Sequence, residues 1–169
     1  MSDRRTRRKP DPEDFQDPLS DYDRPGFADE LERSLSEDSA TAIESRPFSQ
    51  VPPGTPLRDV LRKMADEDIA CIVITENERP IGILSERDVL KRVAGRYDKI
   101  ADQPVSGVMT PDPVVLYETD NPARALNVMG SGLFRHLPLV DADGKLVGVI
   151  GARRVTAYLQ KHFDPISAD

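Results

Sequence analysis

The chain has 169 residues, of which 38% are hydrophobic and 31% charged, and its single cysteine excludes an internal disulfide. The formal net charge of -7 is concentrated in residues 1–45, where 7 Lys and Arg stand against 13 Asp and Glu, a balance of -6. The rest of the chain holds 16 against 17, and this nearly neutral body excludes the basic face that a nucleic-acid-binding protein needs.

No apolar run approaches the length of a membrane-spanning helix, and the first residues lack the hydrophobic stretch of a signal peptide. We therefore expect a cytoplasmic protein that binds neither a membrane nor nucleic acid. Cys71 lies in an apolar run, where a buried and unreactive thiol is expected.

Residues 1–45 combine a basic start with several prolines and a dense run of acids. Such a segment buries too little apolar surface to offset the entropy of ordering it, so we expect disorder up to residue 45. One stretch, from Phe27 to Leu35, has the spacing of a short amphipathic helix that forms when it docks.

From residue 46 the chain repeats itself, in units that we place at residues 46–104 and 105–163, with a tail at 164–169. Each unit opens with a helix-like segment that has a proline in or near its first turn and apolar residues at helical spacing. Met64 of the first unit matches Met129 of the second, an offset of 65 residues. A repeat of this length is too long for a solenoid and too short for two independent domains.

Two apolar strands and a second helix follow the first helix of each unit. The strands are expected at 69–74 and 81–84, then at 137–140 and 146–150, and the second helices at 86–96 and 152–162. The sequence thus predicts an α/β (α+β) fold of two β-α-β-β-α repeats, packed as a pseudo-twofold pair with their sheets facing.

Four stretches of the repeat resemble the cystathionine-beta-synthase (CBS) domain family in its tandem form, the Bateman module. They are Gly82-Ile83-Leu84-Ser85-Glu86-Arg87-Asp88-Val89, Val108-Met109-Thr110-Pro111, Phe134-Arg135-His136-Leu137-Pro138-Leu139-Val140-Asp141 and Gly148-Val149-Ile150. The match covers roughly residues 48–163, and the chain is similar to small stand-alone bacterial CBS-pair proteins.

The resemblance implies a non-catalytic regulatory protein that binds an adenine nucleotide in a cleft between the repeats. AMP, ADP or ATP is the implied ligand, NAD or S-adenosylmethionine stays open, and no cofactor is required. A homodimer and an unidentified enzyme or transporter target are implied as partners. The residues that it assigns to the ligand are Ser85, Arg87 and Asp88 around ribose and phosphate, Val51, Ile69, Ala70 and Cys71 in the adenine slot, and Arg135 and His136 near the phosphates.

Ser85 and Asp88 admit two interpretations from their chemistry alone. Ser85 stands at the expected helix start, beside free N–H groups that suit a phosphate, and the Asp88 carboxylate can accept both hydroxyls of a ribose. The same Ser-x-x-Asp spacing is also an ordinary helix-capping pattern.

The second repeat reads Gly151-Ala152-Arg153-Arg154 at the matching positions. Gly151 has no hydroxyl, and the Arg154 guanidinium cannot accept a hydrogen bond from ribose. Either this half no longer binds a nucleoside, or Arg153 or Arg154 reaches phosphates of a nucleotide seated in the first half. In both cases one ribose site per chain is expected.

Arg135 and His136 either contact phosphate, or are solvated and satisfied by a loop carbonyl. The sequence holds no nucleophile triad, zinc-ligand spacing or phosphate-binding P-loop, so we expect no enzyme. The alternative function is a structural dimerisation or partner-docking protein with a vestigial nucleotide site.

Overall fold

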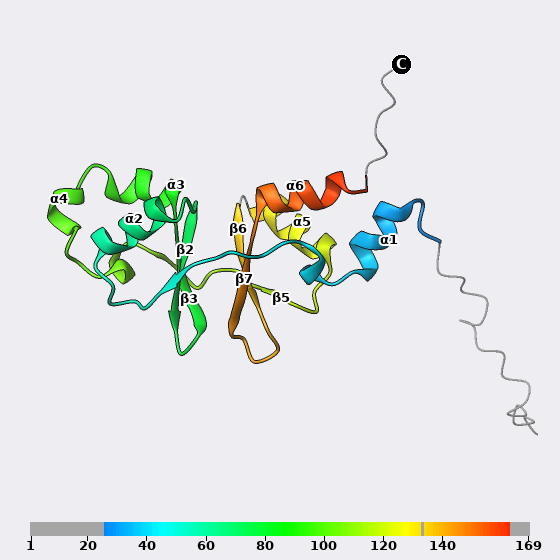
Figure 1. The fold of residues 1–169 in the computed structure, drawn as a ribbon, viewed down its shortest axis with the longest axis horizontal. Helices are drawn as coiled ribbons and strands as arrows, with labels where there is room; N and C mark the ends of the chain where they lie inside the picture. The colour runs from blue at the N-terminus through cyan, green and yellow to red at the C-terminus, as the bar shows by residue number, and fades with distance from the viewer. Residues whose placement is uncertain (1–25, 133, 163–169) are drawn as a thin grey trace, which may run out of the picture.

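A computed structural model describes residues 26–132 and 134–162, and it contains two α/β modules side by side (Figure 1). The first module comprises β1 (Gln50–Val51), α2 (Leu57–Asp66), β2 (Cys71–Glu76), β3 (Arg79–Ser85), α3 (Glu86–Asp88), the π-helical turn η3 (Val89–Val93) and α4 (Tyr97–Ile100). The second comprises β5 (Leu116–Tyr117), α5 (Pro122–Gly132), β6 (His136–Val140), β7 (Leu146–Gly151) and α6 (Ala152–Gln160). Along the chain, the link between the two modules contains η4 (Val105–Gly107) and β4 (Thr110–Pro111), and β4 joins the sheet of the first module.

The sheets of the two modules have the same connectivity. The first has the order β1-β2-β3-β4 and the second β5-β6-β7, and in each the first pair is parallel and the next antiparallel. Cys71 pairs with Ser85 in the first sheet, and His136 pairs with Gly151 at the matching place in the second. The predicted β-α-β-β-α repeat and fold class are confirmed.

Alternation along the strands explains why the two sheets face each other. In β2, Ile72 and Ile74 belong to the core under α2, whereas Cys71 and Val73 point to the opposite face. There they pack against Leu146 and Val149 of the second module, and Figure 1 shows β2 and β3 next to β6 and β7 in the middle of the molecule, with the helices outside. Burial of these aliphatic side chains holds the modules together.

The second helix of the first module differs from the prediction of one helix over 86–96. Only three residues are α-helical before the chain widens into η3, where the main-chain nitrogen of Ala94 donates to the oxygen of Val89 at 3.0 Å. The segment ends before Gly95, a poor helix former. Leu90 of η3 is left 75% exposed.

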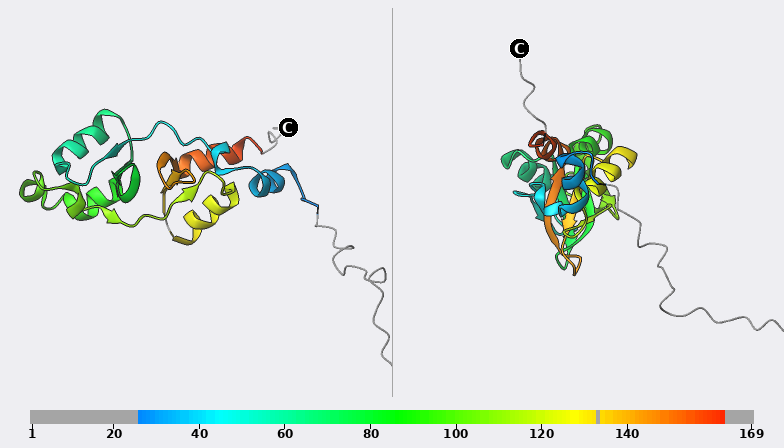
Figure 2. Two further views of the ribbon diagram at one scale, coloured as in Figure 1. Left: turned by 90° about the horizontal axis from the view of Figure 1, so that it is seen from below. Right: turned by 90° about the vertical axis from the view of Figure 1, so that its right-hand side faces the viewer.

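The predicted disorder up to residue 45 is wrong for the part of that segment that the structure describes. Helix α1 (Glu30–Glu37) and the 3-10 turn η2 (Ala40–Ala42) lie beside the second module (Figures 1 and 2), and Ala40 and Ile43 are buried in its core. The Tyr158 hydroxyl donates to Asp38 at 3.0 Å. The acidic composition of the segment predicted disorder, although Ala40 and Ile43 complete the core of the second module. Residues 1–25 lie outside the described part.

Residues 44–49, which we call the crossing segment, run from the second module to β1 of the first (Figure 1). On the way the main-chain nitrogen of Val149 donates to the oxygen of Ser45 at 2.9 Å, so this segment flanks β7 as β4 flanks β3. Gly148 and Gly82 make the two contacts possible, because a Cβ atom at either would collide with Ser45 or Met109 respectively.

None of the helices in the described ranges is long and apolar enough to cross a membrane.

Candidate functional site

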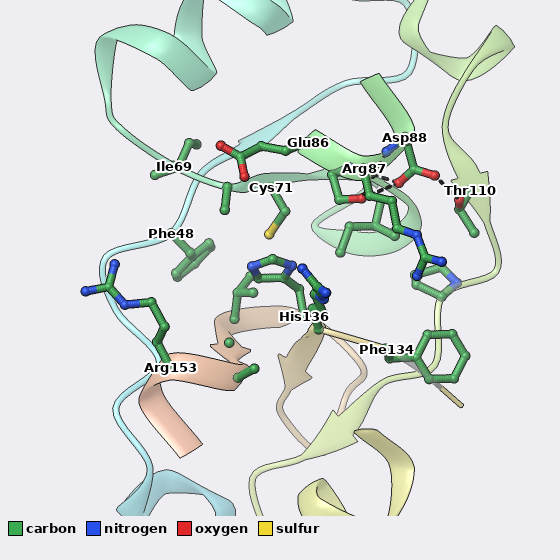
Figure 3. Close-up of a pocket in the computed structure, with 18 of the residues that line it drawn as sticks. Phe48, Ile69, Cys71, Glu86, Arg87, Asp88, Thr110, Phe134, His136 and Arg153 are labelled. Carbon is green, nitrogen blue, oxygen red and sulfur yellow. Dashed lines mark hydrogen bonds between the residues drawn. The ribbon is translucent and has the colours of Figure 1, made fainter. Parts of the chain in front are cut away.

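A pocket of about 1010 Å³ lies between the two modules, where the ends of β3 and β7 meet the starts of β2 and β6 (Figure 3). Eight of the nine predicted site residues line it: Ser85, Arg87, Asp88, Ile69, Ala70, Cys71, Arg135 and His136. Contributions from both modules make this a shared site, as the predicted pairing of the repeats requires.

Val51 is the ninth residue, and it does not line the pocket. It pairs with Ile74 in β1 and is buried in the core of the first module. Phe48, three residues earlier, lines the pocket instead, with the guanidinium of Arg46 over its ring at 5.9 Å. The signal that sequence reasoning missed was an aromatic residue shortly before Val51.

Ser85 and Asp88 form a capping box at the start of α3. One carboxylate oxygen of Asp88, Oδ2, accepts from the main-chain nitrogen and the hydroxyl of Ser85 at 3.1 and 2.5 Å. The other, Oδ1, accepts from the hydroxyl of Thr110 at 3.4 Å and lies 3.5 Å from the Arg92 guanidinium. The carboxylate is 16% exposed, so it is turned toward its own helix start while it still lines an open pocket.

Asp88 and the predicted adenine slot lie on different sides of the pocket. Thr110 belongs to β4, which pairs with β3 on the edge opposite to β2, so its bond to Asp88 directs the carboxylate away from β2. Figure 3 shows Asp88 and Thr110 on the side of Phe134, and Ile69 with Phe48 on the other side. Asp88 and Ile69 thus line the same pocket from different sides.

The apolar residues that the structure does place near Asp88 come from the second module and from the segment after β4. Pro113 and Val114 follow Thr110 closely along the chain, and all three line the pocket together with Phe134. The side chains of Val114 and Phe134 are 40% and 41% exposed, which makes them available to a bound apolar ring.

Arg154 takes the position in the second module that Asp88 has in the first, three residues after the last strand residue. Its guanidinium donates to the main-chain oxygens of Val149 at 3.0 Å and Pro47 at 2.9 Å. It therefore ties the crossing segment to β7. The neighbouring Arg153 is exposed and lies on the Phe48 side of the pocket (Figure 3).

The centre of the pocket holds Cys71 and His136, from opposite modules (Figure 3). Burial raises the pKa of the Cys71 thiol to about 12, which keeps it protonated. Burial also lowers the pKa of His136; the charges of Arg135 and Arg154 lower it further, and that of Glu86 opposes them. A neutral imidazole and a neutral thiol thus face the cavity.

The charged residues of the lining are predominantly basic. The cationic side chains are Arg87, Lys91, Arg92, Arg135, Arg153 and Arg154, and the anionic ones Asp68, Glu86, Asp88 and Asp112. No group of three or more potential metal ligands occurs in the described ranges. The arrangement suits an anionic ligand with an apolar ring and a hydroxyl-bearing part.

A sequence profile of the CBS domain matches residues 40–95 and 105–161. The chain is similar to an uncharacterised 17.7 kDa protein in the bps2 3' region of Acidianus ambivalens, with 31% identity over 104 residues, 61% of this chain and 62% of that protein. It is also similar to the CBS domain-containing protein CBSCBSPB5 of Arabidopsis thaliana, with 33% identity over 101 residues, 59% of this chain and 18% of that protein. The matches thus span less than two thirds of either relative.

Solved structures with the same fold include two that contain AMP. The CBS domain protein PAE2072 from Pyrobaculum aerophilum complexed with AMP aligns with a TM-score of 0.63 and 27% identity, covering 73% of this chain and 98% of that one. The structure of CBSX2 in complex with AMP aligns with a TM-score of 0.62 and 25% identity, covering 72% and 94%.

Proposed function

The chain belongs to the CBS domain family, and from that premise we propose that it is a regulatory protein that binds an adenine nucleotide in the pocket between its two modules. The observation that carries the proposal is the Asp88 carboxylate, which lines an open cavity beside exposed apolar side chains of the other module. The AMP complexes of two relatives support the ligand class. AMP, ADP and ATP are the proposed ligands.

The proposed pose places the ribose on Asp88 and the base on the same side of the pocket. A carboxylate can accept both hydroxyls of a ribose at once. Pro113, Val114 and Phe134 offer apolar side chains on which a base can stack. The phosphates then extend toward the middle of the pocket, where Arg87, Arg135 and His136 line it.

The proposed regulation depends on the position of the ligand between the two modules. A nucleotide that contacts both modules stabilises the arrangement in which both sets of contacts form, and it shifts the equilibrium by its differential affinity. A homodimer and an enzyme or transporter that reads this arrangement are proposed partners, and the chain itself is proposed to be non-catalytic.

Isothermal titration calorimetry of the full chain with AMP, ADP, ATP, NAD and S-adenosylmethionine tests the proposal. We expect at least one of AMP, ADP and ATP to bind, and Asp88→Asn to weaken it by tenfold or more, because an amide keeps one acceptor and introduces a donor; tenfold corresponds to ~1.4 kcal/mol.

Glu32→Gln is the matched control, because Glu32 is also a capping acid but lies on α1, outside the pocket lining. Failure of all five ligands to bind would instead favour the second candidate function, a structural docking protein. The capping box favours that candidate, because it gives Ser85 and Asp88 a structural role without any ligand.

A further inference from the structure

The two halves of the pocket differ in charge. The Asp88 half offers an acceptor, and the matching place in the second module holds two arginines, Arg153 and Arg154. We propose that the second half binds phosphate groups and not a second nucleoside, so that each chain takes one nucleotide with two or three phosphates in preference to a monophosphate. This inference rests on the proposed function and specifies its ligand.

Arg154 makes the second half unsuitable for a ribose. Both of its terminal nitrogens are engaged, one with Val149 and the other with Pro47, which fixes the guanidinium where a carboxylate would be needed. A guanidinium only donates, so the two hydroxyls of a ribose find no acceptor there. A second nucleoside bound as on Asp88 is therefore disfavoured.

Arg153 and Arg135 supply free donors in that half. Both are exposed, and in the described part of the chain neither guanidinium takes part in a hydrogen bond or ion pair. The main-chain nitrogen of Ala152 donates to the oxygen of Arg135 at 2.9 Å, so these two arginines emerge from adjacent points of the pocket wall. Paired guanidinium groups bind phosphate oxygens with charge-assisted hydrogen bonds.

The charge of the lining also favours an anionic ligand. Six cationic side chains face four anionic ones, and Arg92 and Arg154 are already bonded to the protein. Among contacts with the described residues, the cations without such bonds are Arg87, Lys91, Arg135 and Arg153. A terminal phosphate carries about two negative charges, and each additional phosphate adds to that number.

The size and layout of the cavity agree with a longer ligand. Its volume of about 1010 Å³ lies at the upper end of small-molecule sites, which are typically ~300–1,000 Å³. Asp88 and Arg153 lie on opposite sides of the pocket, with His136 between them (Figure 3). A nucleoside on Asp88 therefore needs an extended phosphate chain to approach Arg153.

Calorimetry of the full chain with AMP, ADP and ATP in the presence of EDTA tests this inference. We expect one site per chain and an affinity for ATP about tenfold or more above that for AMP, a difference of ~1.4 kcal/mol. The variant Arg153→Gln is expected to lose this preference while its affinity for AMP changes less than threefold, because the phosphate of AMP does not extend to Arg153.

Arg62→Gln is the matched control, because Arg62 is an exposed cation of α2 outside the pocket lining, and this variant should keep the preference. Equal affinities for AMP and ATP in the unmodified chain would overturn the inference, as would two AMP molecules per chain or an unchanged preference in Arg153→Gln. These outcomes leave the proposed function intact. If no nucleotide binds at all, the proposed function fails and this inference with it.

Discussion

The carboxylate of Asp88 and the hydroxyl of Ser85 hold each other in place at the start of α3. Asp88 accepts from the hydroxyl and the main-chain nitrogen of Ser85, and its own main-chain nitrogen donates back to that hydroxyl at 3.4 Å. One carboxylate oxygen is thereby oriented before any ligand arrives. A ligand that binds Asp88 meets a group with little rotamer freedom left to lose.

Removing the hydroxyl tests the structural value of this pair. Ser85→Ala should lower the free energy of unfolding by about 1 kcal/mol, because the N-cap acceptor and the bond to Asp88 both disappear. Urea unfolding followed by circular dichroism measures the change. Ser131→Ala serves as control, since its hydroxyl bonds only to Asn127 within α5. Equal effects of the two substitutions would mean that the capping box contributes nothing.

The contribution of the N-terminal segment to the second module can be measured at Ile43. This side chain is 1% exposed, and its truncation leaves a cavity among Leu116, Leu137 and Ile150. Ile43→Ala should cost about 2–5 kcal/mol of unfolding free energy. Thr41→Ala, on the exposed side of the same segment, should cost far less. An Ile43→Ala protein as stable as the unmodified chain would show that the segment does not dock in solution.

Close approach of the crossing segment to β7 predicts an effect at Gly148. An added Cβ would meet both the side chain and the main-chain oxygen of Ser45, so Gly148→Ala should destabilise the protein by about 1–3 kcal/mol. Gly54→Ala is the control, because its Cβ would meet nothing within 4 Å. Thermal unfolding of the two variants in parallel measures the difference in melting temperature. A melting temperature for Gly148→Ala equal to that of the control contradicts the packing.

His136 gives the stability a predictable dependence on pH. Its pKa is lowered in the folded state, chiefly by burial, so the unfolded chain binds a proton that the folded chain does not. Stability should therefore rise with pH through the window between the lowered value and about 6.5, the ordinary value for histidine, and be lost as the pH falls through it.

Urea unfolding of the unmodified chain and of His136→Gln between pH 5 and 8 measures this dependence. The unmodified chain should lose unfolding free energy relative to His136→Gln as the pH falls below the ordinary pKa of histidine, about 6.5. The reason is that glutamine does not titrate, so the variant lacks the proton that binds His136 on unfolding. The described part of the chain keeps a second histidine, His162, in both proteins, so its titration cancels in the difference. A difference that stays constant across the range is incompatible with a partly buried imidazole whose pKa is lowered.

The repeat, the strand pairs and eight of the residues that line the pocket could be predicted because they leave periodic or motif signals. The unbroken apolar run through Ile72, Val73 and Ile74 is visible in the sequence, and so is the Ser85-to-Asp88 spacing. The direction in which Asp88 points could not be predicted. It depends on β4, a strand of two residues without periodicity, which reaches the edge of β3 only in the folded chain.

The docking of residues 30–45 could be predicted only in part: the spacing from Phe27 to Leu35 indicated a short docked helix, which α1 confirms, but the face that it docks on and the turn after it were hidden. Their composition is acidic, and only Leu35, Ala40 and Ile43 reach the second core. Three apolar residues among many charged ones do not reveal a partner face that lies more than seventy residues further along the chain. Sequence composition describes what a segment can bury alone, and here the burial is shared with another part of the protein.

The crossing segment has a consequence for how the protein can be divided. Because Ala40 and Ile43 complete the second core before the chain enters β1, neither module corresponds to one uninterrupted stretch of sequence. Cutting the gene between the repeats would strip one half of its packing residues and leave them attached, solvent-facing, to the other. We therefore expect the two modules to unfold together, as one unit.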